Sequence, residues 1–259
     1  MGVPTVGCRC AVCTSADPRD RRLRPSLLVE WQAGGQAGGR AHAVVIDTGP
    51  DFREQALRAG LTRLDAVFYS HGHADHILGM DDLRPLSYAA SREGGQIPLY
   101  ASEETAEVMR RIYDYTFAAD ATYPNRARVR LEPLAERVNV QEVEFLRVPL
   151  LHGKMAIAGF RFGRAAYLTD VSTIPEESFA LLKGLDVLIV SALRHKPHPS
   201  HATLDQAKDW AQRIGARQTW FTHIAHDLGH EETNRTLPVG MALAYDGLSF
   251  SVELGTATP

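Results

Sequence analysis

The sequence predicts a layered α/β domain, with β-sheets inside and helices outside. Two observations predict this class: short apolar runs typical of strands occur in both halves of the chain, and segments with helical spacing of apolar residues lie between them. A third observation concerns the number of domains. No Pro-, Gly- and Ser-rich linker divides the 259 residues, which are therefore interpreted as a single domain, 1–259.

The first half of the chain begins with a predicted hairpin. Strands are predicted at 26–31, 42–47 and 66–69, and a helix at 52–59. The glycine pairs at 34–35 and 38–39 indicate that the first two strands form a hairpin with a loose tip. The strand at 66–69 ends abruptly at Ser70, which is typical of a buried strand that delivers polar residues at its carboxyl end.

The rest of the chain repeats this alternation. Residues 103–115 predict an amphipathic helix, and 117–130, which contains Tyr123-Pro124-Asn125, predict an irregular surface excursion. Further strands are predicted at 143–148, 156–162, 165–169, 187–190 and 218–222, helices at 176–183 and 204–214, and a terminal hairpin around Asp246-Gly247.

Composition excludes several classes of function. The chain has 28 basic and 31 acidic residues, a formal net charge of −3, so we expect no stable nucleic-acid complex. No apolar run approaches the roughly 18 residues that a bilayer span needs, so we expect no membrane association. The first residues have neither a basic start nor a long apolar stretch, and a cytoplasmic location is the expectation.

The segment that follows the strand at 66–69 is dense in metal-binding side chains. His71, His73, Asp75 and His76 place three imidazoles and a carboxylate within six positions, a combination that suits zinc and similar cations. Four ligands cannot complete the shells of two ions, so further ligands are expected at other strand ends. The residues at such positions are His152, Asp170 and His223.

This pattern resembles the metallo-β-lactamase superfamily, whose hallmark is His-x-His-x-Asp-His followed at long intervals by His, Asp and His. The resemblance covers nearly the whole chain and implies a four-layer αββα sandwich with a two-metal site. It implies that one ion is held by His71, His73 and His152, the other by Asp75, His76 and His223, and that Asp170 bridges them. Asp47 matches the Asp-x-Gly turn of the superfamily and would orient ligands, although a plain capping role is an alternative.

The amino-terminal segment 1–25 contains a motif that identifies a narrower group than the histidine pattern does. Its three cysteines, Cys8, Cys10 and Cys13, lie within six residues, and in a reducing compartment this crowding suggests a metal before a disulfide. The motif Gly2-Val3-Pro4-x-x-Gly7-Cys8-x-Cys10-x-x-Cys13 resembles the PhnP-like group of cyclic-phosphate phosphodiesterases. That resemblance implies a structural zinc on the three thiolates and His226. A basic turn, 17–24, follows the cysteines.

The start of the chain departs from the PhnP-like pattern. Such chains carry a hydrophobic strand and a Gly-Thr-Gly-Thr-Ser segment before Gly-Val-Pro, whereas this chain starts at the Gly-Val-Pro motif itself. The first strand is therefore expected to be missing, through either a truncated start or a real loss. A truncated start predicts that DNA upstream of Met1 encodes the strand in frame.

The resemblance implies a metal-dependent phosphodiesterase that cleaves small, cyclic phosphodiesters by attack of a metal-bridging hydroxide. The expected cofactors are two catalytic divalent ions, Zn or Mn, and one structural Zn. Asp75 and His201 are the expected catalytic residues, with His201 contacting the phosphoryl group from the loop 194–201. Within that loop, His195 and His198 are interpreted as exposed residues.

Other functions stay open at this stage. The alternatives are a tRNA-end nuclease, a thioesterase of the glyoxalase II type, or a non-catalytic zinc-binding carrier. An iron-based redox role is disfavoured, since flavodiiron relatives have Glu at the position of His73. The expected partner is a small phosphodiester substrate, and a homodimer is left open.

Overall fold

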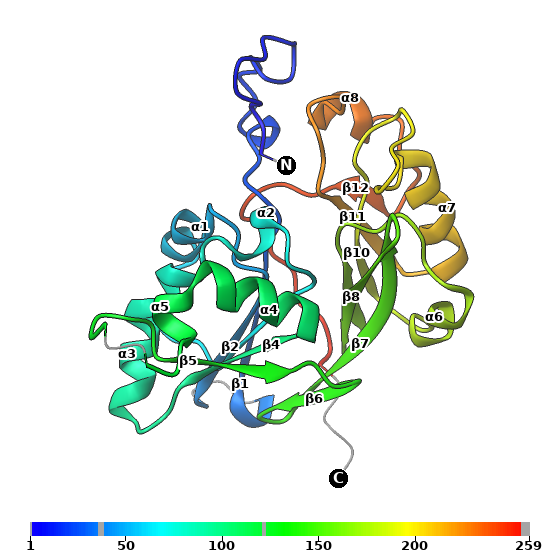
Figure 1. Ribbon diagram of the computed structural model, residues 1–259. Coiled ribbons are helices and arrows are strands. Elements are labelled where there is room, and N and C mark those ends of the chain that lie inside the picture. Colours follow the sequence, from blue (N-terminus) through cyan, green and yellow to red (C-terminus); the bar gives the residue numbers. More distant parts are fainter. Residues whose placement is uncertain (1, 36–38, 121–122, 255–259) are drawn as a thin grey trace. The chain divides into compact units, whose positions relative to one another are not determined.

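The computed structural model describes residues 2–35, 39–120 and 123–254, and the chain divides into two compact units (Figure 1). One unit consists of residues 26–142, and the other combines 1–25 with 143–259. Each unit contains its own sheet and its own helices. Among the described residues, no helix is both long and apolar enough to cross a bilayer.

The unit 26–142 contains a five-stranded sheet in the order β1-β2-β3-β4-β5. Only β1 and β2 pair antiparallel, and the other neighbours are parallel. The strands are β1 (Leu27–Gln32), β2 (Ala41–Ile46), β3 (Ala66–Phe68), β4 (Ile97–Ala101) and β5 (Val129–Pro133); the helices are η2 (Ala33–Gly35), α1 (Phe52–Arg58), α2 (Ala74–Ile77), η3 (Met80–Leu83), α3 (Arg84–Arg92), α4 (Glu103–Ile112) and α5 (Asp114–Phe117); β6 (Arg137–Val140) ends the unit.

The helices of this unit cover one face of its sheet. Val45, Val67 and Leu99, which lie on neighbouring strands, pack in one core cluster with Phe52 of α1 and Met109 of α4. These five side chains are almost completely buried, and burial of large apolar side chains at about 25 cal/mol per Å² is the main stabilising contribution.

The second unit contains the strands β7 to β12, in the spatial order β12-β11-β10-β9-β8-β7. They are β7 (Val143–His152), β8 (Met155–Phe162), β9 (Ala165–Leu168), β10 (Val187–Ser191), β11 (Gln218–Thr222) and β12 (Met241–Leu243); the helices are η1 (Pro18–Asp20), α6 (Glu176–Leu181), α7 (Leu204–Ile214) and α8 (His230–Asn234). β8 is antiparallel to both neighbours, whereas β9 to β12 are parallel. Helix α7 contributes Leu204, Ala207 and Ala211 to the core of this sheet.

Most predicted elements are confirmed, and one is wrong. The predicted terminal hairpin does not form: β12 instead pairs in parallel with β11, and no strand follows it up to residue 254. The side chain of Asp246, which suggested the hairpin turn, accepts a hydrogen bond from the N–H of Leu23 at 3.0 Å. Asp246 therefore bonds to a segment distant in sequence and does not form a hairpin turn.

Two other predictions are adjusted. The helix predicted over 103–115 is interrupted at Tyr113, which separates α4 from α5. The predicted excursion 117–130 is irregular after Phe117 and passes into β5 at Val129. Its residues 121–122 and the hairpin-tip residues 36–38 lie outside the described part of the chain.

Candidate active site

Asp47, directly after β2, organises the first group of predicted ligands. Its Oδ1 accepts a hydrogen bond from the N–H of Ser70 at 2.8 Å, and its Oδ2 accepts from the Ser70 hydroxyl at 2.7 Å and from Nδ1 of His76 at 2.8 Å. The residue is completely buried. A buried carboxylate with three donors fixes the orientation of those donors, so this geometry supports the predicted orienting role.

The same hydrogen bonds decide which ring nitrogens can bind a metal. Because Nδ1 of His76 donates to Asp47, Nε2 of His76 carries the lone pair. The Ser70 hydroxyl gives its proton to Asp47, so Nδ1 of His71, 3.0 Å from that oxygen, is the donor and its Nε2 carries the lone pair. Nε2 of His71 lies 3.0 Å from Nδ1 of His73. This is near the separation of two nitrogens on one zinc ion with bonds of about 2.1 Å.

The turn after β2 is hydrogen-bonded to the loop that contains these histidines. The Thr48 N–H donates to the His76 carbonyl, and the Gly79 N–H donates to the Thr48 carbonyl, each at 2.8 Å. A Cβ on Gly79 would lie 2.1 Å from the Gly49 carbonyl oxygen, so the close approach requires glycine. Asp75 lies in α2 beside this contact, with Oδ2 3.8 Å from Nε2 of His76.

In the other unit, three predicted ligands meet at one edge of the sheet. β7, β9 and β11 run in the same direction, so their carboxyl ends share an edge. His152, Asp170 and His223 are located there. Oδ1 of Asp170 lies 3.3 Å from Nε2 of His223, and Nδ1 of His152 donates to the Asp170 carbonyl at 2.8 Å. That bond leaves the lone pair of His152 on Nε2.

His201 joins this group from outside the predicted ligand set. Its ring stacks on His223 with centroids 4.8 Å apart, and its ligand atom lies within 4.8 Å of those of His152 and Asp170. Nδ1 of His201 is buried, has no hydrogen-bond partner among the described residues, and lies 3.9 Å from Oδ2 of Asp170. Burial, with a further contribution from His223, lowers the pKa of His201 to about 3.

The backbone around His201 is fixed by its neighbours. The Ala202 N–H donates to the carbonyl of Val171 at 2.9 Å, which holds the loop against the end of β9. Helix α7 then begins with a capping box, in which the side chains of Thr203 and Gln206 bind each other's backbone N–H groups. His201 therefore has rigid structure on its carboxyl side.

Backbone strain is concentrated at the predicted site. Among the described residues, four non-glycine residues have positive φ: Asp47 (64°), Gln141 (53°), Asp170 (56°) and His223 (52°). Gln141 lies in the turn between β6 and β7, and the other three are predicted site residues. Because such a conformation costs on the order of 1–3 kcal/mol, its retention at these residues is typical of a functional site.

The three cysteines converge on His226. The sulfur atoms of Cys8, Cys10 and Cys13 lie 3.1, 3.5 and 3.4 Å from Nδ1 of His226, and the four ligand atoms lie within 4.8 Å of one another. The N–H of Cys13 is the main cause that lowers the pKa of the Cys10 thiol to about 7, which favours the thiolate. Three sulfurs and one imidazole nitrogen fit a closed tetrahedral zinc site.

A buried ion pair next to this cluster was not predicted from the sequence, which indicates only a basic turn at 17–24. Arg22 is 6% exposed, and its guanidinium donates to the Asp20 carboxylate at 3.0 Å and to the carbonyls of Ala225 and Leu228 at 3.1 and 2.7 Å. Asp20 also accepts from the N–H of His230 at 2.8 Å. Charge patterning alone gives no signal for the two carbonyl bonds, because their acceptors are backbone atoms about two hundred residues away.

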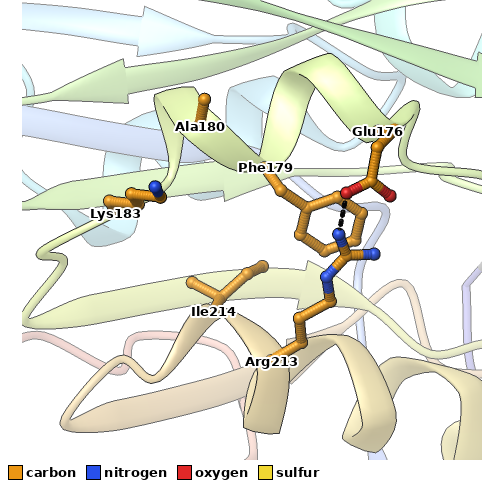
Figure 2. Close-up of a pocket in the computed structure, with 6 residues that line it drawn as sticks. All are labelled: Glu176, Phe179, Ala180, Lys183, Arg213 and Ile214. Atoms are coloured by element: carbon orange, nitrogen blue, oxygen red, sulfur yellow. Dashed lines mark hydrogen bonds and ion pairs between the residues drawn. The ribbon is translucent and has the colours of Figure 1, made fainter.

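A surface groove of about 290 Å³ lies between α6 and α7 (Figure 2). In it the guanidinium of Arg213 stacks 3.6 Å over the Phe179 ring and pairs with Glu176. The groove contains none of the predicted site residues. We therefore do not assign it to the active site.

Comparison with known proteins identifies the class. Residues 42–224 match the beta-lactamase superfamily domain. The chain belongs to this superfamily, and its two sheets with their helices form the metallo-β-lactamase fold. The protein is accordingly a metal-binding hydrolase of the metallo-β-lactamase superfamily.

Within the superfamily, the chain belongs to the PhnP-like proteins. It is similar to a crystal structure described as a new diphosphatase from the PhnP family, with 50% identity, a TM-score of 0.89, and coverage of 99% of this chain and 95% of that one. The predicted resemblance is thereby confirmed.

Two curated relatives carry other names. An octanoyltransferase of Porphyromonas gingivalis is 36% identical over 97% of this chain, and the chain spans 49% of that protein's length. Coenzyme PQQ synthesis protein B of Methylobacterium nodulans is 28% identical over 73% of this chain and 68% of its own.

Proposed function

We propose that the protein hydrolyses small phosphoric diesters at a two-metal centre. The observation that supports this proposal best is the position of His201. An imidazole that is not needed as a ligand lies against Asp170 and His223, where a phosphoryl group bound at the metals would need a hydrogen-bond donor.

The ligand atoms that each unit offers suit the proposed ions. The catalytic ligands would be His71, His73, Asp75, His76, His152, Asp170 and His223, and the structural zinc ligands Cys8, Cys10, Cys13 and His226. The Nδ1 atoms of His76 and His152 are occupied by acceptors, so each ring offers Nε2, as a metal ligand must. Zinc or manganese bound there would lower the pKa of a water and neutralise phosphoryl oxygens.

The chain's own residues would position the diester and move its proton. His201, neutral at its lowered pKa, would donate a hydrogen bond to the phosphoryl group, or would protonate the departing oxygen if the negative charge of the bound phosphate raises that pKa. Asp75 would contribute a carboxylate at the reaction centre besides serving as a ligand. Asp47 would act through His76, which it orients.

Two classes of diester are candidates. The PhnP-like motif favours a cyclic phosphate, whereas the similar structure with 50% identity is named a diphosphatase, which favours a phosphoric anhydride. A tRNA-end nuclease, a thioesterase and a zinc-binding carrier are the remaining alternatives, and they differ in the substrates that they would consume.

The test is a substrate screen of the purified protein loaded with zinc or manganese. The substrates are bis(p-nitrophenyl) phosphate, a 2′,3′-cyclic nucleotide, p-nitrophenyl phosphate and a glutathione thioester. We expect both diesters to be hydrolysed much faster than the monoester and the thioester. Equal or faster turnover of the monoester or the thioester would contradict the proposal.

A further inference from the structure

His198 is not the exposed residue that the sequence suggests. Its side chain is half-buried, whereas His195 and Lys196 of the same loop are exposed. The His198 ring lies 4.9 Å from the His201 ring, centroid to centroid. His201 in turn contacts His223 and His152, so His198 is the next imidazole outward from the predicted metal ligands.

The loop holds His198 in place from both sides. Pro197 and Pro199 flank it and restrict the backbone. The guanidinium of Arg194 donates to the carbonyls of Lys196 and Pro197 at 3.1 and 2.9 Å, which closes the loop on itself. A side chain this constrained is prepared to contact a ligand at low entropic cost.

The hydrogen bonds of His198 also determine what it can offer. The N–H of Ser200 donates to Nδ1 of His198 at 3.3 Å, so Nδ1 is the acceptor and Nε2 carries the proton. Nε2–H is therefore a hydrogen-bond donor, and no protein acceptor for it is recorded among the described residues. A donor next to the proposed phosphoryl contact suits a second anionic group.

We propose that His198 binds the second phosphoryl group of a linear diphosphate diester whose first phosphoryl group lies at His201. This inference rests on the proposed function and narrows it to one substrate class. A diphosphate places two anionic groups one bridging oxygen apart, and two neighbouring imidazoles can each contact one of them. A cyclic phosphate has only one phosphorus and would leave His198 unused.

The reaction consumes one water. Its oxygen bonds to the phosphorus at His201, the bond from that phosphorus to the bridging oxygen breaks, and the bridging oxygen leaves on the second phosphoryl group at His198. With ADP-ribose as substrate, the products are AMP and ribose 5-phosphate. His198 holds the second phosphoryl group by a hydrogen bond before and after this cleavage.

The test compares ADP-ribose with 2′,3′-cyclic AMP in wild type, His198→Ala, His198→Gln and His195→Ala. We expect His198→Ala to lower kcat/KM for ADP-ribose by about 10- to 100-fold, chiefly through KM, which is the usual effect of losing a hydrogen bond to a charged group. Hydrolysis of 2′,3′-cyclic AMP should stay within about threefold of wild type. His198→Gln, which retains an N–H donor, should restore part of the loss, and His195→Ala should behave as wild type.

A binding measurement gives a readout that does not depend on turnover. His198→Ala should weaken binding of α,β-methylene-ADP and leave binding of inorganic phosphate unchanged. Equal losses on both substrates would show that His198 only orients His201, and unchanged ADP-ribose kinetics would exclude any role; either result overturns the inference while the proposed function stands. If wild type hydrolyses neither substrate, the proposed function itself is wrong.

Discussion

At the scale of single residues, His201 has the environment of a group that acts on substrate. Its Nδ1 is buried without a hydrogen-bond partner among the described residues, although it lies beside the Asp170 carboxylate. We expect His201→Ala to lower kcat by roughly 10²- to 10⁴-fold with unchanged metal content, the usual contribution of a positioned acid or oxyanion donor. His73→Ala should instead lose both metal and activity. Elemental analysis and steady-state kinetics of both variants check this.

Substrates with good and poor leaving groups distinguish the two possible roles of His201, acid and phosphoryl-binding residue. If the residue acts as an acid, a good leaving group such as p-nitrophenolate should partly rescue His201→Ala, because it needs little protonation. A full-sized defect with good and poor leaving groups would indicate phosphoryl binding. Loss of metal from His201→Ala would show that the contact with His152 and Asp170 is ligation, contrary to this prediction.

Asp47 combines a strained backbone with three buried hydrogen bonds. Asp47→Asn preserves size and tolerance of positive φ but replaces an acceptor oxygen by an N–H₂ group that faces other donors. We expect metal affinity to fall by about 10- to 100-fold, as for other partners that orient metal ligands. Asp65→Asn is the matched control, since Asp65 is a buried carboxylate of the same unit that binds His42 and the Ala43 N–H.

Titration with a metal-sensitive dye measures both Asp47→Asn and its control. Asp65→Asn should lower thermal stability and leave metal affinity unchanged. If the two variants lose metal equally, the effect of Asp47 is general destabilisation and not ligand orientation.

At the scale of elements, the cysteine segment is expected to form a structural metal site separate from the catalytic one. Cys10→Ser replaces a thiolate by a hydroxyl, a poor zinc ligand, so we expect the metal content to fall from about three ions to about two per chain, with a lower melting temperature. The catalytic pair should remain. Elemental analysis that finds no metal lost from Cys10→Ser would refute a site formed by Cys8, Cys10, Cys13 and His226.

The Arg22–Asp20 pair fixes the segment 225–230 on both sides of His226. Arg22→Met removes the bonds to the Ala225 and Leu228 carbonyls and leaves the Asp20 carboxylate buried without its cation. We expect the free energy of unfolding to fall by about 3–5 kcal/mol. Arg21→Met, at an exposed neighbour, should change it by no more than about 0.5 kcal/mol. Chemical denaturation measures both, and equal effects would contradict the assignment.

Individual strands and contacts show what the sequence can and cannot predict. Strands are predicted at 66–69 and 187–190, and observed at 66–68 and 187–191, because continuous apolar runs end there in polar residues. β4 escapes prediction because Pro98 argues against a central strand, and β12 because three residues carry no periodicity. The ligand residues are predictable from type and spacing. The contacts of Arg22 are not, because they depend on tertiary structure.

At the scale of the whole molecule, the predicted catalytic ligands are divided between two compact units. His71, His73, Asp75 and His76 belong to residues 26–142, and His152, Asp170 and His223 belong to the other unit. Neither set by itself completes two metal shells, because a catalytic ion needs three protein ligands or more. Both sets of ligands are thus needed for the predicted pair of ions.

This assignment of ligands predicts how metal stabilises the fold. A ligand that binds only the native state adds about RT ln(1 + [L]/Kd), or about 2.7 kcal/mol at a hundredfold excess over Kd. Starting from Cys10→Ser, which removes the structural ion, zinc should raise the melting temperature. Adding either His73→Ala or His152→Ala should abolish most of that rise, because the resemblance assigns both residues to the same ion. Calorimetry with and without chelator measures the rise, and a rise that survives one of the two substitutions would show that His73 and His152 do not serve the same ion.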